Sequence, residues 1–203
     1  DYQAEATGHL VVQAADALGV ALTRSMSVPL FTAIATDTGW FRFGSVTAET
    51  YRTIARLIDA GVVPCEVYGD LYERDSLGRI RLRGLVLSRT KAEIDGTLMH
   101  TYVEKEDFEA MGAAPNDTED AINLTLAVKG AQAAVIFVGQ VRGGFKLSFR
   151  SQGEMDCNEV AQQFGGGGHK AAAGAFVEGT LDEVQGRVLP VVREAMRVAL
   201  GQC

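Results

Sequence analysis

Four consecutive glycines, Gly165 to Gly168, restrict the fold of this chain more than any other feature of its sequence. Glycine loses more backbone entropy on folding than any other residue, so an ordinary turn would rarely use four of them in a row. Upstream, the spacing Asp156-x-x-Glu159 is typical of a helix start. Downstream, the segment 172–177 has the apolar pattern of a strand. We therefore expect the glycines to connect a helix to a strand, with His169 at the end of the run.

The chemistry that such a loop offers is anion binding. Backbone N–H groups without Cβ atoms around them can approach a phosphate or carboxylate closely, and His169 adds a side-chain donor. The loop does not match a P-loop, since Lys170 is followed by Ala171 rather than by the hydroxyl residue that binds magnesium. It does not match a dinucleotide-binding fingerprint either, because that motif follows a strand and opens a helix. A purely structural turn is the alternative interpretation.

The chain divides into two parts of different pattern. Apolar residues at helical spacing predict helices in the first part: one over 6–18, one from about Ser25 to the turn that begins at Thr36, one between the cap Thr47 and the exit Gly61, and a short one from Pro64. After the hairpin signal Asp95-Gly96, strands and helices alternate. We predict an α/β fold in which a first domain at 1–75 is joined by a connecting, helical segment at 76–90 to a second, mixed-sheet domain at 91–203.

The same periodicity predicts which helix faces are buried. In the first helix the expected stripe is Val11, Ala14, Ala15 and Leu18, and in the helix that Thr47 caps it is Tyr51, Ile54, Ala55 and Ile58. These residues should therefore belong to the core of the first domain.

Composition excludes several classes of protein. A net charge of −7 argues against binding long duplex nucleic acid, which needs a broad basic surface, although short anionic substrates need only a few local cations. The apolar stretches fall far short of the roughly 20 residues of a membrane span, and the first residues lack the pattern of a secretory signal. The cysteines Cys65, Cys157 and Cys203 are scattered, which indicates neither a disulfide framework nor a zinc site. A cytoplasmic protein is expected.

The combined motifs resemble a known family. A helix followed by Gly-Gly-Gly-Gly-His and Ala-Ala-Gly resembles the loop of the DHH-associated domain, and Phe149-Arg150-Ser151 resembles the Arg-Ser pair that precedes it in the nanoRNase branch of the DHH phosphoesterases. The resemblance implies that these motifs hold the terminal phosphate, sugar and base of a substrate. The implied substrate-binding residues are Arg150, Ser151, Gly165, Gly166, Gly167, Gly168 and His169.

Two further residues gain roles through this resemblance. Asp37, in Thr36-Asp37-Thr38-Gly39, could be a simple turn former, but it matches the last metal-binding motif of the DHH domain and is our candidate catalytic residue and metal ligand. Asn123 lies in the segment 117–128, which has a helical pattern, and is a candidate substrate-side residue. The acidic residues that begin this segment, Glu119 among them, are interpreted as helix capping.

The resemblance also implies a mechanism and a cofactor. The family hydrolyses phosphoesters with a water activated by two manganese ions, magnesium being the alternative ion. The sequence contains no Asp-His-His, so it resembles the C-terminal portion of such an enzyme, and only the Asp37 motif of the metal centre is present. We expect the centre to be incomplete and the chain by itself to be inactive.

The predicted parent activity is that of a manganese-dependent phosphoesterase on short oligoribonucleotides or 3′-phosphorylated adenosine nucleotides, held in a cleft between the domains. Alternatives are a nucleotide-binding regulatory module without catalysis, a cyclic-dinucleotide phosphodiesterase, and a RecJ-type single-strand exonuclease, which the absence of an extended basic path disfavours. The expected partner is short RNA or a nucleotide. The sequence leaves open the preferred substrate, the physiological metal, and the oligomeric state, a homodimer included.

Overall fold

The structure, a computed structural model, describes residues 4–118 and 120–201. Glu119 and Cys203 lie outside this part of the chain. The chain forms two compact units, Asp1–Arg74 and Asp75–Cys203. In the described residues, no helix combines the length and apolar character that a membrane crossing requires.

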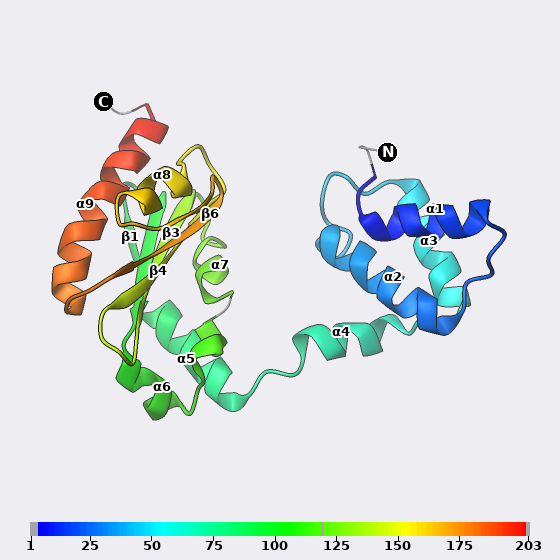
Figure 1. Cartoon of the computed structure of the whole chain (residues 1–203), viewed down its shortest axis with the longest axis horizontal. Helices are drawn as coiled ribbons and strands as arrows, with labels where there is room; N and C mark the ends of the chain where they lie inside the picture. The colour runs from blue at the N-terminus through cyan, green and yellow to red at the C-terminus, as the bar shows by residue number, and fades with distance from the viewer. Residues whose placement is uncertain (1–3, 119, 202–203) are drawn as a thin grey trace. The chain divides into compact units, whose positions relative to one another are not determined.

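The first unit is helical (Figure 1), with elements α1 (Thr7–Ala17), α2 (Arg24–Asp37), α3 (Ala48–Asp59) and α4 (Pro64–Tyr72). The local start signals act as predicted. Thr47 accepts a hydrogen bond from the backbone of Thr50 in a capping box, and Pro64 is the first residue of α4. Phe31, Ile34 and Leu57 are almost fully buried at the centre of this unit.

The buried faces of these helices differ from the prediction. Val11 and Leu18 of the first predicted helix are exposed, while Val12 is buried in α1. In α3, Tyr51 and Ile58 are exposed, and the buried face contains Ile54 and Leu57. Ala15 and Ile54 are buried as predicted, so the helical period was right and each stripe was only partly misplaced, because the neighbouring helices decide which residues flank its centre.

The second unit is built on one mixed sheet, as predicted. Its described strands are β1 (Lys91–Glu93), β2 (Leu98–Val103), β3 (Ala133–Gly139), β4 (Phe145–Ser151), β5 (Gly167–His169) and β6 (Ala172–Val177). They lie in the order β1-β2-β3-β4-β6-β5, and the neighbours β2 and β3 are parallel while the other pairs are antiparallel. The short glycine-rich strand β5 was not predicted, and it forms one edge of the sheet.

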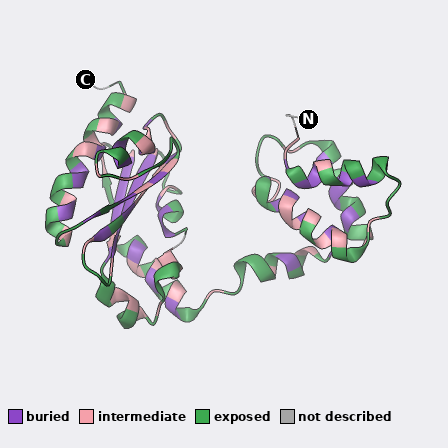
Figure 2. Cartoon of the chain, viewed as in Figure 1, coloured by how far each residue is buried: buried purple, intermediate pink, exposed green. Residues whose placement is uncertain are grey.

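Helices cover both faces of this sheet. One face packs against α8 (Cys157–Gln162) and α9 (Leu181–Ala199), and the other packs against α5 (Leu77–Ser88), α6 (Lys105–Met111) and α7 (Ala121–Thr125). Figure 1 shows α9 on one side of the strands and α7 on the other. In Figure 2 the buried residues concentrate on the strands and on the inward faces of these helices. The second unit therefore has two hydrophobic layers.

Two predicted segments are corrected by this arrangement. The segment 76–90, expected to connect the domains, forms α5 with Ser76 as its cap, and its Leu82 and Val86 are buried within the second unit. The helix expected over 117–128 is shorter and broken. A 3₁₀ turn at Pro115–Thr118 precedes α7, and Asp120 between them has a left-handed backbone with φ of 63°.

A cluster of three charged or titratable side chains, Glu93, Arg193 and His100, links the sheet to α9. Glu93 of β1 accepts two hydrogen bonds from Arg193 of α9, at 2.5 and 2.9 Å, and its carboxylate lies 3.0 Å from Nε2 of the buried His100. The bonds from Arg193 lower the pKa of Glu93, and burial lowers the pKa of His100. This group therefore ties the long C-terminal helix to the β1 edge of the sheet.

The Glu93→Gln variant should be less stable at pH 7 by about 1–3 kcal/mol, because charge-assisted hydrogen bonds from Arg193 are weakened. The folded pKa of Glu93 lies below its unfolded value of about 4.3, so its stabilisation is complete above that pH and is lost as pH falls through the folded pKa. Urea unfolding from neutral to acid pH should show the stability gap narrowing below about pH 4.

The control is Glu109→Gln, because Glu109 is exposed on α6 and forms no ion pair with any described residue. That variant should match the wild type throughout. A gap for Glu93→Gln that stays constant across the whole pH range would show that the carboxylate charge contributes nothing.

Candidate functional site

Strand β4 separates a buried face from a polar face. Phe145, Leu147 and Phe149 are buried against α8 and α9. The alternate residues Lys146, Ser148 and Arg150 point to the other face, since successive side chains on a strand alternate. On that face the helices α5 to α7 cover mainly β2 and β3, so the polar side chains of β4 border open space.

The strand register brings two predicted site residues onto this polar face. Arg150 of β4 lies directly opposite Ala172 of β6, and Ala172 lies directly opposite His169 of β5. Residues directly opposed on antiparallel strands have side chains on the same face. The guanidinium and the imidazole therefore flank Ala172, with Cα atoms two strand spacings, roughly 10 Å, apart. Long side chains at this separation can converge on one anion.

A hollow of about 280 Å³ adjoins Arg150. Lys146, Ser148 and Arg150 form one wall, and Asp120 and Ile122 from the start of α7 contribute to the other. The hollow thus combines two cations and a hydroxyl with an apolar floor and one carboxylate. Such a mixed lining suits a small ligand that carries both a negative charge and an apolar ring.

The amides of the glycine loop do not form the open nest that the sequence suggested. Gly165 N–H donates to the carbonyl of Gln162 at 3.1 Å, and Gly166 N–H donates to that of Ala161 at 2.9 Å. Gly168 N–H donates to the side chain of Asn158 at 2.9 Å. These three donors are satisfied within the protein, so anion binding through them would require their present bonds to break.

Backbone conformation explains one of the four glycines in this loop, and steric contacts explain two. Gly165 has a left-handed φ of 71° directly after α8. A Cβ on Gly166 would lie 2.1 Å from the carbonyl oxygen of Gly174, and a Cβ on Gly168 would lie 2.5 Å from that of Ala172. A Cβ on Gly167 would meet only Asn158, at an ordinary 3.6 Å. Gly167 is thus the one position of the four where neither backbone nor packing requires glycine.

Asn158 is a residue that sequence reasoning missed. It lies in the first turn of α8, where its own N–H donates to the cap Asp156, and its side-chain oxygen holds the amide of Gly168. An asparagine in a first helical turn has no distinctive pattern in sequence, since its partner is ten residues away. In the structure it fixes the edge strand β5 to the helix beneath it.

The structure does not bring Ser151 to the face of Arg150. Ser151 follows Arg150 on β4, so its side chain points to the opposite face, where it is 8% exposed. Its hydroxyl donates to the carbonyl of Gly153 and accepts from Gly153 N–H, both at 3.2 Å. The hydroxyl of Ser151 thus holds the turn after β4, and the predicted role of Ser151 as a substrate ligand stays a prediction.

Asn123 lies on the exposed side of α7, on the same face of the sheet as Arg150. Its side chain donates to Asp120 at 3.2 Å, and Asp120 lines the hollow beside Arg150. Asn123 thus contacts the rim of the site through Asp120 and does not itself line the hollow. Its predicted role as a substrate-side residue stays a prediction.

Asp37 ends α2 in the first unit and is exposed there. Directly after it, Gly39, Trp40 and Phe41 all have left-handed backbones, with φ of 56°, 57° and 64°. Edge-to-face contacts of Phe31 with both Trp40 and Phe41 hold this turn. The aromatic contacts therefore fix the backbone of the turn that follows Asp37.

The metal centre implied by the family resemblance does not fit these residues alone. Within 4–118 and 120–201, no three His, Cys, Asp or Glu side chains gather closely enough to hold a metal ion. Asp37 offers a single hard oxygen donor, whereas two ions would need several. We therefore derive no catalytic step through a metal.

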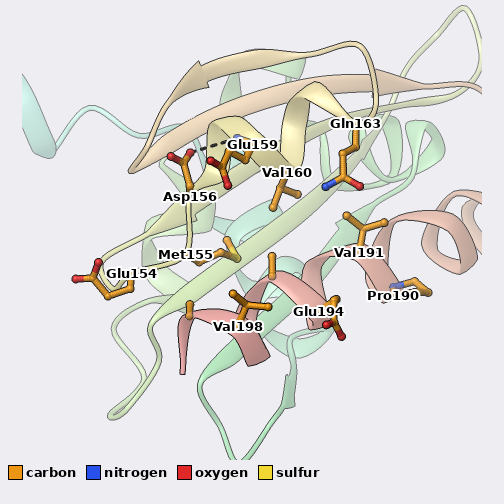
Figure 3. A pocket seen from close by; sticks show the side chains of 12 residues that line it. Glu154, Met155, Asp156, Glu159, Val160, Gln163, Pro190, Val191, Glu194 and Val198 are labelled. Atoms are coloured by element: carbon orange, nitrogen blue, oxygen red, sulfur yellow. Dashed lines mark hydrogen bonds between the residues drawn. The ribbon is translucent and has the colours of Figure 1, made fainter. Parts of the chain in front are cut away.

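A larger hollow, of about 540 Å³, lies between α8 and α9 on the opposite face of the sheet (Figure 3). Its rim is acidic and carries Glu154, Asp156, Glu159 and Glu194. Four carboxylates disfavour a phosphate, so we place the candidate anion site at the Arg150 end of the smaller hollow despite the difference in volume.

Comparison with known proteins identifies the family of the second unit. The family model described as DHHA1 domain matches residues 95–197. The bifunctional oligoribonuclease and PAP phosphatase NrnA of Thermus thermophilus is 36% identical over 94% of this chain and 57% of its own length. The protein of the same name from Bacillus subtilis is 26% identical over 73% of this chain and 46% of its own. The chain thus spans about half the length of these curated relatives.

A solved structure is similar over both units. The crystal structure of an exopolyphosphatase-related protein from Bacteroides fragilis has a TM-score of 0.82 and 28% sequence identity to this chain. The similarity covers 97% of this chain and 57% of that protein. Two units of this architecture therefore occur together in a longer relative.

The glycine loop yields a paired prediction. Gly166→Ala should destabilise the second unit by about 1–3 kcal/mol, since its Cβ would overlap the backbone of β6. Gly167→Ala should leave the free energy of unfolding within about 1 kcal/mol of the wild type, because the new Cβ has room. Urea unfolding of both variants tests this contrast, and equal losses of stability would contradict it.

The end of α2 yields a second prediction. Asp37→Asn should stabilise the first unit by about 0.3–1 kcal/mol, because a carboxylate at a helix C-terminus opposes the helix dipole. Asp59→Asn at the end of α3 is the matched control and should gain a similar amount, as measured by urea unfolding. A loss of stability in the Asp37 variant alone would show that its carboxylate has a structural role.

Proposed function

The chain belongs to the DHHA1 domain family, and we propose from this membership that it is part of a phosphoesterase acting on short oligoribonucleotides or 3′-phosphorylated adenosine nucleotides. The observation that carries the proposal is the row formed by Arg150, Ala172 and His169 on one sheet face. A guanidinium and an imidazole on either side of a small residue leave space for a phosphate between them. The named activities of the relatives support this choice of ligand.

In this proposal the second unit binds the substrate and Arg150 is the main phosphate ligand. A planar guanidinium can donate two parallel hydrogen bonds to phosphate, and charge-assisted bonds of this kind are about twice as strong as neutral ones. His169 adds a donor from the edge strand β5. Packing does not require a glycine at position 167, and the missing side chain there would let the substrate approach the backbone closely.

Hydrolysis is proposed only for the whole protein. The whole protein would use manganese as its metal and act in the cytoplasm. Asp37 would contribute one donor, and the further donors would come from outside the described residues. A nucleotide-binding module without catalysis would use the same site. Assaying manganese-dependent hydrolysis of two- to five-residue RNA by this chain and by a longer form that carries Asp-His-His separates the two functions.

The direct test is nucleotide binding by this chain, measured by calorimetry with adenosine 3′,5′-bisphosphate. Arg150→Ala and His169→Ala should each weaken binding by roughly 1.5–3 kcal/mol, the value of a charge-assisted hydrogen bond. Both side chains are at least partly exposed, so the variants should keep the stability of the wild type.

The control variant is Arg187→Ala, since Arg187 is an exposed arginine on α9 at the opposite face of the sheet. Its affinity should equal that of the wild type. Unchanged affinity in both the Arg150 and His169 variants would overturn the proposed site.

A further inference from the structure

The polar face of the sheet continues past Arg150 along β4. Ser148 and Lys146 follow at alternate positions, and all three side chains line the same hollow. Lys146 lies four residues from Arg150, a distance of about 13 Å along the strand. The two cations thus mark opposite ends of one wall.

An exposed aromatic ring stands beside the far cation. Phe176 of β6 lies directly opposite Lys146 in the strand register, so both side chains lie on the polar face. Phe176 is 49% exposed although it occupies the interior of a strand. Its ring packs over Gly144 in the turn before β4, where a Cβ would come within 2.8 Å of the ring. The tip of the ring therefore lies close to the turn.

The residues between these two ends are small. Ala172 and Gly174 of β6 separate the His169 end from Phe176, and Gly174 lies directly opposite Ser148. This leaves a shallow floor, flanked by hydroxyl and cation on β4. Neither Lys146 nor Arg150 forms an ion pair with any described residue, and Asp120 is the described carboxylate that lines the hollow.

We infer that Lys146 and Phe176 form a second nucleotide subsite, in which Lys146 binds the internucleotide phosphate and Phe176 stacks on the adjoining base. An aromatic ring beside a cation on an open sheet face is the combination that binds single-stranded nucleotides without sequence preference. The substrate class of the site is then a nucleotide chain of at least two units. This inference rests on the proposed function, which places the terminal phosphate at Arg150 and His169.

The test compares two probes that differ by one nucleotide, AMP and the 5′-phosphorylated diadenylate pApA, bound to the full chain and measured by calorimetry. The wild type should bind pApA at least about tenfold more tightly than AMP, since a charge-assisted bond and a stacked base are added. Lys146→Met should weaken pApA binding about tenfold and leave AMP binding within about twofold. Phe176→Ala should weaken pApA binding at least about fivefold, again without affecting AMP.

Lys91→Met is the matched control, because Lys91 is an exposed lysine on β1 at the opposite edge of the sheet. It should change neither affinity. Thermal unfolding of each variant shows whether a weakened affinity results only from loss of folding. Arg150→Ala should weaken the binding of AMP and of pApA by the same factor.

Each outcome separates the second subsite from the proposed function. Equal wild-type affinities for the two probes would overturn the subsite. So would a loss in Lys146→Met that is the same for AMP as for pApA, since Lys146 would then serve the first phosphate. If Arg150→Ala changes neither affinity, the proposed function itself fails, whatever the Lys146 variant does.

Discussion

The alternation of side chains on β4 is the constraint on which the second unit depends. Leu147 and Phe149 build the core beneath α8 and α9, and the residues between them supply the charges of the site. A slip of one residue in the pairing would bury Arg150 and expose Phe149. The register is fixed twice, because β4 pairs with β3 on one side and β6 on the other. The hydrophobic packing that folds the sheet therefore also sets the face on which Arg150 lies, and the guanidinium donates to the carbonyl of Phe149 at 3.1 Å.

Local signals predicted most of the elements, and tertiary pairing decided what they missed. Thr47 and Thr180 cap helices through bonds within four residues, which a sequence pattern shows directly. Strand β5 has no side-chain pattern at all over its glycines, and it exists because β6 offers an unpaired edge beside it. The buried phase of α1 and α3 likewise depends on neighbouring helices, so Val11 and Tyr51 were assigned to the wrong face.

The site shows the same division between local and long-range information. Motif resemblance identified Arg150 and His169, and the register places them on one face. It also suggested Ser151, whose side chain lies on the opposite face from Arg150, and this difference could be seen only once the boundary of β4 was known. From the sequence, the glycines were explained by the room that they leave for an anion beside the backbone. At Gly166 and Gly168 the structure shows instead that a Cβ atom would have no space. Asn158 could not be found in sequence, because its role depends on a hairpin that folds back over α8.

The turn after Asp37 shows how packing can hold a residue that weakens its own helix. Left-handed backbone costs roughly 1–2 kcal/mol for a side chain such as Trp40 or Phe41. Each edge-to-face aromatic pair returns about 0.5–1.5 kcal/mol, and Trp40 makes such contacts with Phe31, Tyr68 and Tyr72. The aromatic cluster thus offsets a strain that begins at Trp40, three residues after the carboxylate. Since neither the strain nor a carboxylate at a helix C-terminus stabilises the fold, the pair of features favours a functional role for Asp37.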